Sequence, residues 1–226
     1  MLRALYKAVA QLPDPPVKRV LVRGVMIGIA TYVALVAGVR AGLAHVQLFQ
    51  DAWADWTAGL AIGLAATLLP LLFFPALVTT ITSFMLEGVA DAVEARHYPG
   101  LNWPRPQRWT EVLGTSLRFL LVIAAANLLA LPVYLALLLT GLALPLSFAV
   151  NGYLLGREYF ELVALRRLPP AEARVLFSNR LGRFWLGGVV IAFLFSIPLV
   201  NLAAPVIATA FMVHLFQSLQ PPARKV

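Results

Sequence analysis

Two long apolar stretches of this chain are each broken by prolines, and that combination restricts how the chain can fold. The first stretch, residues 119–156, has about 38 residues without a charge. The second runs from residue 184 to about residue 217. The prolines that break them are Pro132 and Pro145 in the first and Pro198 and Pro205 in the second. Because proline lacks a backbone N–H and pushes the preceding residue away from helical geometry, each stretch predicts two helices joined by a turn.

Composition places these stretches in a membrane. Of the 226 residues, 61% are hydrophobic and 12% are charged, and the mean hydropathy is +0.83. A soluble domain of this length could not cover so much apolar surface, since about half of its residues must face water. The chain contains no cysteine, which excludes disulfides and thiolate-bound zinc or iron–sulfur clusters.

Two earlier apolar segments are long enough to cross a bilayer. Residues 24–39 are uncharged, and the arginines on either side of them can reach the headgroups. Residues 56–86 are uncharged over about 31 residues, which exceeds a hydrocarbon core of about 30 Å at roughly 1.5 Å per residue. We expect the second span to continue into a cytoplasmic helical extension.

The basic residues predict the orientation. The net charge is +8, and every Lys and Arg except Arg40 lies in or just after the N-terminal arm (residues 1–23), in residues 96–118 or 157–183, or at the C-terminus. Because Lys and Arg are enriched in cytoplasmic loops, we expect all four regions, the N-terminus included, to be cytoplasmic. The surplus of positive charge therefore does not indicate a nucleic-acid partner.

This orientation requires each proline-broken stretch to enter and leave the membrane on the same side. About 13 residues separate Arg118 from Pro132, and a similar number separates Arg183 from Pro198. A helix of that length reaches roughly 20 Å, which is short of the hydrocarbon core. We therefore expect an all-α integral membrane protein with two transmembrane helices plus two Pro-broken, partly inserted helical hairpins. Six transmembrane helices are the alternative.

The expected organisation is a single membrane domain over residues 1–226. Its parts are an amphipathic N-terminal arm (1–19), two spans with the cytoplasmic helix extension (20–96), the first hairpin (119–156) and the second hairpin (184–218).

Three blocks of the sequence resemble a known family. They are "SFMLEGVADAVEARHYPG" at 83–100, "GREYFELVALRRL" at 156–168 and "FSIPLVNLAAPVIATAFMVHLF" at 195–216. Their order and spacing are similar to those of the CysZ-type sulfate permeases, the bacterial members of the etoposide-induced protein domain family. The resemblance covers most of the chain after the N-terminal arm.

The resemblance implies a homo-oligomeric protein of the bacterial inner membrane that imports sulfate for cysteine biosynthesis. Its partners would be sulfate or a related oxyanion, membrane lipids and further copies of itself. The family's sulfate site lies just before the first long helix, and the matching stretch here is "PPVKRVLV", which places the site on Lys18 and Arg19. Lysine supplies a point charge there, without the planar fork with which arginine grips an oxyanion.

A second candidate site follows the second span. Glu87, Asp91 and Glu94 stand at i, i+4 and i+7, and therefore on one face of a helix. We interpret these acids, together with Arg96, as a pore or gate. The alternatives are a solvated face, or pairing of the acids with the nearby Arg96 and with basic loops. We assign packing at the hairpin tips to Asn127, Pro132, Pro198, Asn201 and Pro205, because a buried asparagine can bond a neighbouring helix or subunit.

Enzymatic function is not indicated. The chain has no phosphate-binding loop, no nucleophile elbow and no HExxH spacing among its three histidines, so we expect no metal, no cofactor and no catalytic residues. The alternative to a permease is a non-transporting membrane scaffold that binds lipid or a partner protein through the same basic loops.

Overall fold

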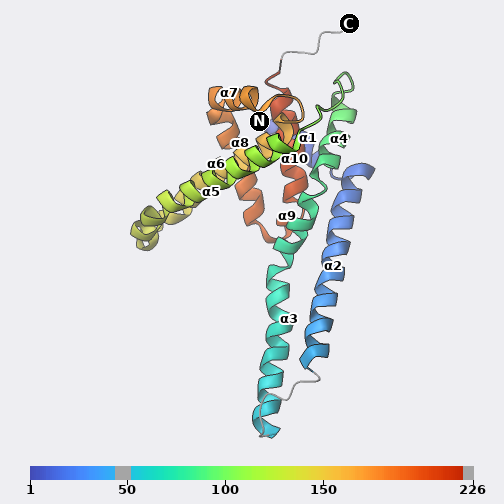
Figure 1. The fold of residues 1–226 in the computed structure, drawn as a ribbon, viewed down its shortest axis with the longest axis vertical. Helices are drawn as coiled ribbons and strands as arrows, with labels where there is room; N and C mark the ends of the chain where they lie inside the picture. The colour runs from blue at the N-terminus through green and yellow to red at the C-terminus, as the bar shows by residue number, and fades with distance from the viewer. Residues whose placement is uncertain (44–51, 221–226) are drawn as a thin grey trace.

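The structure is a computed structural model that describes residues 1–43 and 52–220. Within these ranges it consists of helices, with no strand. They are α1 (Leu2–Ala10), α2 (Pro15–Leu43), α3 (Ala52–Ser83), α4 (Leu86–His97), α5 (Trp109–Leu137), the 3-10 turn η1 (Leu138–Thr140), α6 (Ala143–Ala164), α7 (Pro170–Asn179), α8 (Leu181–Ser196), α9 (Pro198–Asn201) and α10 (Ala204–Gln217). Figure 1 shows α2 and α3 as a long pair beside a more compact region around α10, from which the hairpin of α5 and α6 projects. The predicted all-α membrane protein is confirmed.

Small residues bring α2 and α3 close together. Gly24 and Gly28 of α2 lie against Thr82 and Val78 of α3, and a Cβ atom at either glycine would collide with the facing side chain. This is the Gly-x-x-x-Gly spacing that lets membrane helices pack tightly. By length and composition, α2 can cross a membrane over Pro15–Gly42, and the 32 residues of α3 reach roughly 48 Å. The pair contains most residues of the two expected spans, 24–39 and 56–86.

The second hairpin turns where its prolines predict. Ile197 is extended (φ −94°, ψ 114°), Pro198 begins the short α9, and Pro205 lies in the first turn of α10. The flanking helices α8 and α10 have 16 and 14 residues and so reach roughly 24 and 21 Å, less than the hydrocarbon core. In Figure 1 the tip at α9 lies beside α3 and well short of its far end.

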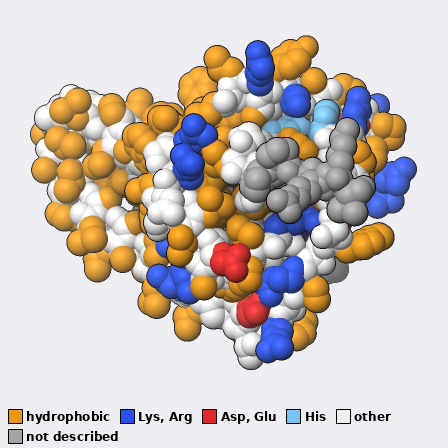
Figure 2. All heavy atoms as spheres, turned by 90° about the horizontal axis from the view of Figure 1, so that it is seen from above, with side chains coloured by type: hydrophobic (Ala, Val, Ile, Leu, Met, Phe, Trp, Pro, Cys, Tyr) orange, Lys and Arg blue, Asp and Glu red, His pale blue; other side chains and the backbone are white. Residues whose placement is uncertain are grey.

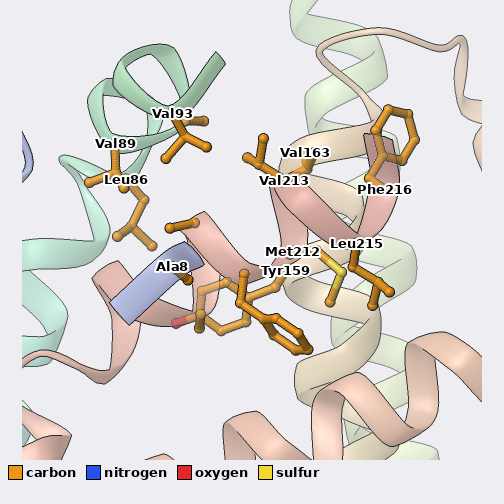
Figure 3. Close-up of a cluster of buried hydrophobic side chains, with 14 of the residues drawn as sticks. Ala8, Leu86, Val89, Val93, Tyr159, Val163, Met212, Val213, Leu215 and Phe216 are labelled. Carbon is orange, nitrogen blue, oxygen red and sulfur yellow. The ribbon is translucent and has the colours of Figure 1, made fainter. Parts of the chain in front are cut away.

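Helix α10 is the centre of the compact region. Every residue from Ala204 to Phe216 is buried, as expected for a helix that is apolar on all sides. Figure 3 shows Met212 and Val213 of α10 among side chains from α1, α4 and α6. The N-terminal helix α1 is thus packed against the C-terminal helix of the described chain, through contacts that include Ala8.

One polar side chain within α10 is fully bonded. His214 is buried, its Nδ1 lies 2.9 Å from the Tyr98 hydroxyl, and its Nε2 lies 3.3 Å from Oε1 of Gln11. An amide oxygen accepts hydrogen bonds, so Nε2 carries the proton in this arrangement and Nδ1 accepts from Tyr98. These bonds connect α10 to the end of α4 and to the residue that follows α1.

The first hairpin differs from the sequence-based expectation. Pro132 does not end its helix, because α5 continues through it to Leu137, and the turn lies at residues 138–142. Leaving the helix at Pro132 would expose several backbone groups to apolar surroundings, whereas continuing leaves one carbonyl without its usual donor. The expectation that Pro132 packs at the tip is therefore wrong for this hairpin.

Thr140 and Gly141 make the turn instead. The Thr140 hydroxyl donates to the Leu137 carbonyl at 2.8 Å and accepts from the Leu142 N–H at 3.3 Å, so it satisfies backbone groups that the turn would leave unpaired. Gly141 has φ +74°, a left-handed conformation that glycine adopts without steric cost. The chain then enters α6.

The slant of the first hairpin, and not its length, makes it end short of the far end of the α2–α3 pair. The segment Trp109–Thr140 has 32 residues and is long and apolar enough to cross a membrane. Figure 1 shows, however, that α5 and α6 run at a steep slant to the α2–α3 pair and that their tip lies about level with α9. Both hairpins therefore end well before the far end of α3, which is the arrangement expected for partly inserted hairpins.

The two hairpins meet through backbone contact between α6 and α8. Gly152 and Gly156 of α6 face Gly188 of α8, and a Cβ atom on Gly188 would collide with the backbone of both glycines of α6. The Trp185 indole N–H, also on α8, donates to the Ala149 carbonyl of α6 at 2.9 Å. This second Gly-x-x-x-Gly contact locks the hairpins together.

Replacing Gly188 with alanine is expected to destabilise the protein, because the new methyl group meets immovable backbone. Gly182→Ala is the matched control: it lies in the same helix, and a Cβ atom there meets nothing within 4 Å. Thermal unfolding in detergent should show a lower midpoint for Gly188→Ala and an unchanged or slightly higher one for Gly182→Ala, since alanine favours helix by about 0.5–1 kcal/mol. Equal midpoints for the two variants would contradict the close α6–α8 contact.

Candidate functional site

Helix α4 carries the three carboxylates that the sequence placed on one face, but their surroundings differ. Glu94 is buried, with 6% of its side chain exposed, whereas Asp91 is 60% exposed. Glu87 also lies at the surface, where it lines a cavity together with Glu158 and Glu161. Of the three acids, only Glu94, the nearest to the C-terminal end of α4, is therefore buried.

Two consecutive arginines from the segment between α6 and α7 bind this part of α4. Arg166 places its Nη2 against Oδ1 of Asp91 and 3.2 Å from Oε2 of Glu94. Arg167 grips Glu94 with two donors, Nε to Oε1 at 3.2 Å and Nη2 to Oε2 at 2.5 Å. We call these four residues the Glu94 cluster. Such a two-point guanidinium–carboxylate pair is among the stronger polar contacts in proteins.

The Glu94 cluster also fixes the segment between α4 and α5. Arg167 donates through Nη1 to the Asn102 carbonyl, and the backbone N–H of Arg105 donates to the Arg166 carbonyl at 2.8 Å. Arg105 in turn pairs with Glu111 in the first turn of α5 at 2.8 Å. One network thus connects α4, the base of the first hairpin and the approach to α7.

Charge is retained in this buried setting. Burial acts to lower the pKa of Arg166, but the hydrogen bonds and negative charges of Asp91 and Glu94 outweigh it and raise that pKa above the ordinary arginine value. Arg166 is therefore a cation held by carboxylates, and Arg167 pairs with Glu94 beside it. An oxyanion offers a guanidinium the same acceptor geometry as a carboxylate does, so it can compete for these arginines.

Arg96 lies outside the Glu94 cluster. It pairs with Asp14 at the joint between α1 and α2, although the sequence-based interpretation grouped it with the acids of its own helix. Asp14 also accepts a hydrogen bond from the Gln11 amide at 3.4 Å. Arg96 thus fixes the N-terminal arm to the end of α4.

Lys18 and Arg19 lie on the first turns of α2, which begins at Pro15. Both side chains are exposed, and among the described residues neither makes an ion pair. The carboxylate of Asp14 stands immediately before this helix. The structure does not bring Lys18 and Arg19 together with the Glu94 cluster.

The asparagines assigned to the tips occupy different positions. Asn201 is the last residue of α9, at the tip of the second hairpin. Asn127 lies in the middle of α5, is exposed, and donates to the Ile123 carbonyl of its own helix at 2.9 Å. Contact of Asn127 with another copy of the chain remains a prediction.

Sequence reasoning allowed the acidic face to pair with basic loops but did not identify Arg166 and Arg167 as its partners. The two consecutive arginines of "GREYFELVALRRL" were available as a signal, but they lie more than 70 residues from Glu94, so helical spacing cannot pair them. Figure 2 shows the face seen from above Figure 1, where Lys and Arg side chains greatly outnumber Asp and Glu and apolar side chains cover the projecting lobe. This matches the expected separation of a basic face from apolar hairpins.

Comparison with known families assigns the chain. Residues 4–205 match the family described as Sulfate transporter CysZ/Etoposide-induced protein 2.4, which covers most of the 226 residues. The chain therefore belongs to this family, and the family predicted from the three sequence blocks is confirmed. No curated protein matches the chain.

Glu94→Gln is expected to destabilise the protein, because it leaves Arg167 without a carboxylate and Arg166 with Asp91 alone. Removing one partner of a buried ion pair costs about 3–5 kcal/mol, and we expect the lower end of that range here. Glu87→Gln makes the same chemical change on the exposed part of the same helix and should alter stability by less than about 0.5 kcal/mol. Urea unfolding followed by tryptophan fluorescence distinguishes them; equal stability of the two variants would show that the Glu94 cluster does not support the fold.

Proposed function

We propose that this chain is a sulfate permease of the bacterial inner membrane that imports sulfate for cysteine biosynthesis. The observation that carries the proposal is the family match over residues 4–205, because the family is described as a sulfate transporter family. The all-α membrane fold and the basic face support it. In this proposal the N-terminus is cytoplasmic, the protein works as a homo-oligomer in contact with lipid, and no catalytic step is involved.

Sulfate carries two negative charges and is strongly hydrated, so a path across the membrane needs fixed cations to replace its water. Lys18 and Arg19 are candidates for one such contact, since they are exposed and have no carboxylate partner among the described residues. They stand within the first turns of α2, where the helix dipole adds a partial positive charge.

The Glu94 cluster is the proposed gate. Its carboxylates occupy the guanidinium groups that an oxyanion would otherwise bind, so the path is closed to anions while the pairs are intact. Sulfate that reaches Arg166 and Arg167 replaces a carboxylate as their acceptor and opens the connection. Asp91 is the more exposed of the two acids and would be displaced at lower cost.

Uptake of labelled sulfate into proteoliposomes tests the proposal. Wild-type protein should give saturable uptake that excess unlabelled sulfate suppresses and equimolar chloride does not. The Lys18→Ala/Arg19→Ala variant should lower the initial rate at least tenfold. The control is Arg3→Ala/Lys7→Ala, which removes one arginine and one lysine from exposed positions on α1.

Uptake by folded wild-type protein that is no faster than in protein-free liposomes would contradict the permease and favour the scaffold. Rapid uptake by the Lys18→Ala/Arg19→Ala variant would retain the permease and remove these two residues from its path.

A further inference from the structure

A cavity of about 460 Å³ lies between α5, α6 and α7, at the base of the first hairpin. Its volume falls within the range of about 300–1,000 Å³ that is usual for small-molecule sites. Its arginine and small hydroxyl side chains are Arg118, Arg157, Arg174, Thr110, Thr115 and Ser178. Each of the three helices contributes one arginine. We call this space the arginine cavity.

The arginine cavity adjoins the Glu94 cluster without sharing its charged residues. Leu165, which lines the cavity, directly precedes Arg166, and Glu111, which also lines it, pairs with Arg105 of the same network. None of Asp91, Glu94, Arg166 and Arg167 lines the cavity. It is therefore a separate site at the same junction.

The charges that line the cavity do not cancel. Its two carboxylates are already engaged: Glu111 pairs with Arg105, and Glu161 pairs with Arg157, each at 2.8 Å. This leaves Arg118 and Arg174, whose side chains make no ion pair or hydrogen bond among the described residues. Two uncompensated cations on opposite elements, α5 and α7, match the charge of a dianion.

Arg157 is the fixed part of the site. It is buried, its Nε donates to Oε1 of Glu161 at 2.8 Å, and its guanidinium carbon lies 5.9 Å from the centre of the Phe119 ring. These contacts hold one guanidinium in place at the wall, whereas the long side chains of Arg118 and Arg174 are exposed and can adjust to a ligand.

Neutral donors complete the lining. Thr110 and Thr115 place hydroxyl groups at the cavity, and neither hydroxyl makes a hydrogen bond within the described residues. Pro170 and Ala173 of the first turn of α7 also line the cavity, but they offer no free backbone donor, because proline lacks an N–H and the Ala173 N–H donates to the Pro169 carbonyl at 3.0 Å. The donors at the cavity are therefore arginine and hydroxyl groups, which bind sulfate and phosphate groups in proteins.

We propose that the arginine cavity binds a tetrahedral oxyanion with two negative charges. Arg157 is the fixed donor, and Arg118 and Arg174 move onto the bound oxyanion from either side. Free sulfate and the phosphomonoester headgroup of phosphatidic acid share this chemistry. As a sulfate site the cavity rests on the proposed function, since it would be a cytoplasmic stage of the same path.

Sulfate binding to the purified full-length protein in detergent tests the site. Isothermal titration should show saturable binding of sulfate to wild type, and thermal unfolding should show a higher midpoint in sulfate than in chloride of equal ionic strength. Arg118→Gln/Arg174→Gln should weaken the affinity at least tenfold. Arg108→Gln/Arg180→Gln removes the same charge from exposed arginines outside the cavity and should change the affinity less than twofold.

A second arm identifies the source of the oxyanion. The thermal unfolding of wild-type protein is measured in mixed micelles that contain phosphatidic acid or phosphatidylcholine. If only phosphatidic acid raises the unfolding midpoint, and Arg118→Gln/Arg174→Gln abolishes this effect, the site binds the lipid headgroup. Equal binding by wild type and this variant, or no binding of either oxyanion to folded wild type, would overturn the proposal. If wild-type protein binds sulfate in the arginine cavity but does not take up sulfate into proteoliposomes, the permease is rejected and the site is kept. If wild-type protein takes up sulfate and Arg118→Gln/Arg174→Gln binds sulfate as tightly as wild type does, the site is rejected and the permease is kept.

Discussion

The carboxylate of Glu94 is the charge on which the arrangement of the junction between α4, α5, α6 and α7 depends. A buried carboxylate is tolerated only when cations and hydrogen-bond donors compensate it, and here Arg166 and Arg167 do so. Because those arginines lie at the end of α6, their contact sets the position of the first hairpin relative to α4 and hence to the α2–α3 pair. The same segment positions Arg105, and through it the start of α5. Cationic side chains thus gather where several helices meet.

Packing inside the membrane region uses different means. Both close helix contacts, α2 with α3 and α6 with α8, depend on glycine pairs spaced four residues apart, which allow backbones to approach without polar bonds between side chains. The apolar helix α10 fills the space between them, and its one ionisable residue, His214, is bonded on both ring nitrogens. Rigid apolar contacts therefore hold the hairpins, while the charges remain at one end, where an anion can meet them.

The sequence predicted one hairpin better than the other, for a physical reason. Pro198 and Pro205 begin helices after short breaks, so the second turn lies where proline chemistry puts it. Pro132 stands inside a long helix, and the signal for the first turn was the threonine and glycine that follow residue 139. Helical spacing gave the acidic face of α4 correctly, but not its partners, because contacts between segments more than 70 residues apart depend on the complete fold. The cavity between α5, α6 and α7 could not be predicted from the sequence either, although its arginines lie in the two basic regions, residues 96–118 and 157–183.

The central claim is that this junction serves an oxyanion on its way into the cell. Growth of a bacterium that lacks its own sulfate importers, with sulfate as the sole sulfur source, tests this claim most directly. We expect the chain to restore growth at limiting sulfate and to have no effect when cysteine is supplied. Failure to restore growth, with the protein inserted in the membrane at normal abundance, would contradict sulfate import by this chain.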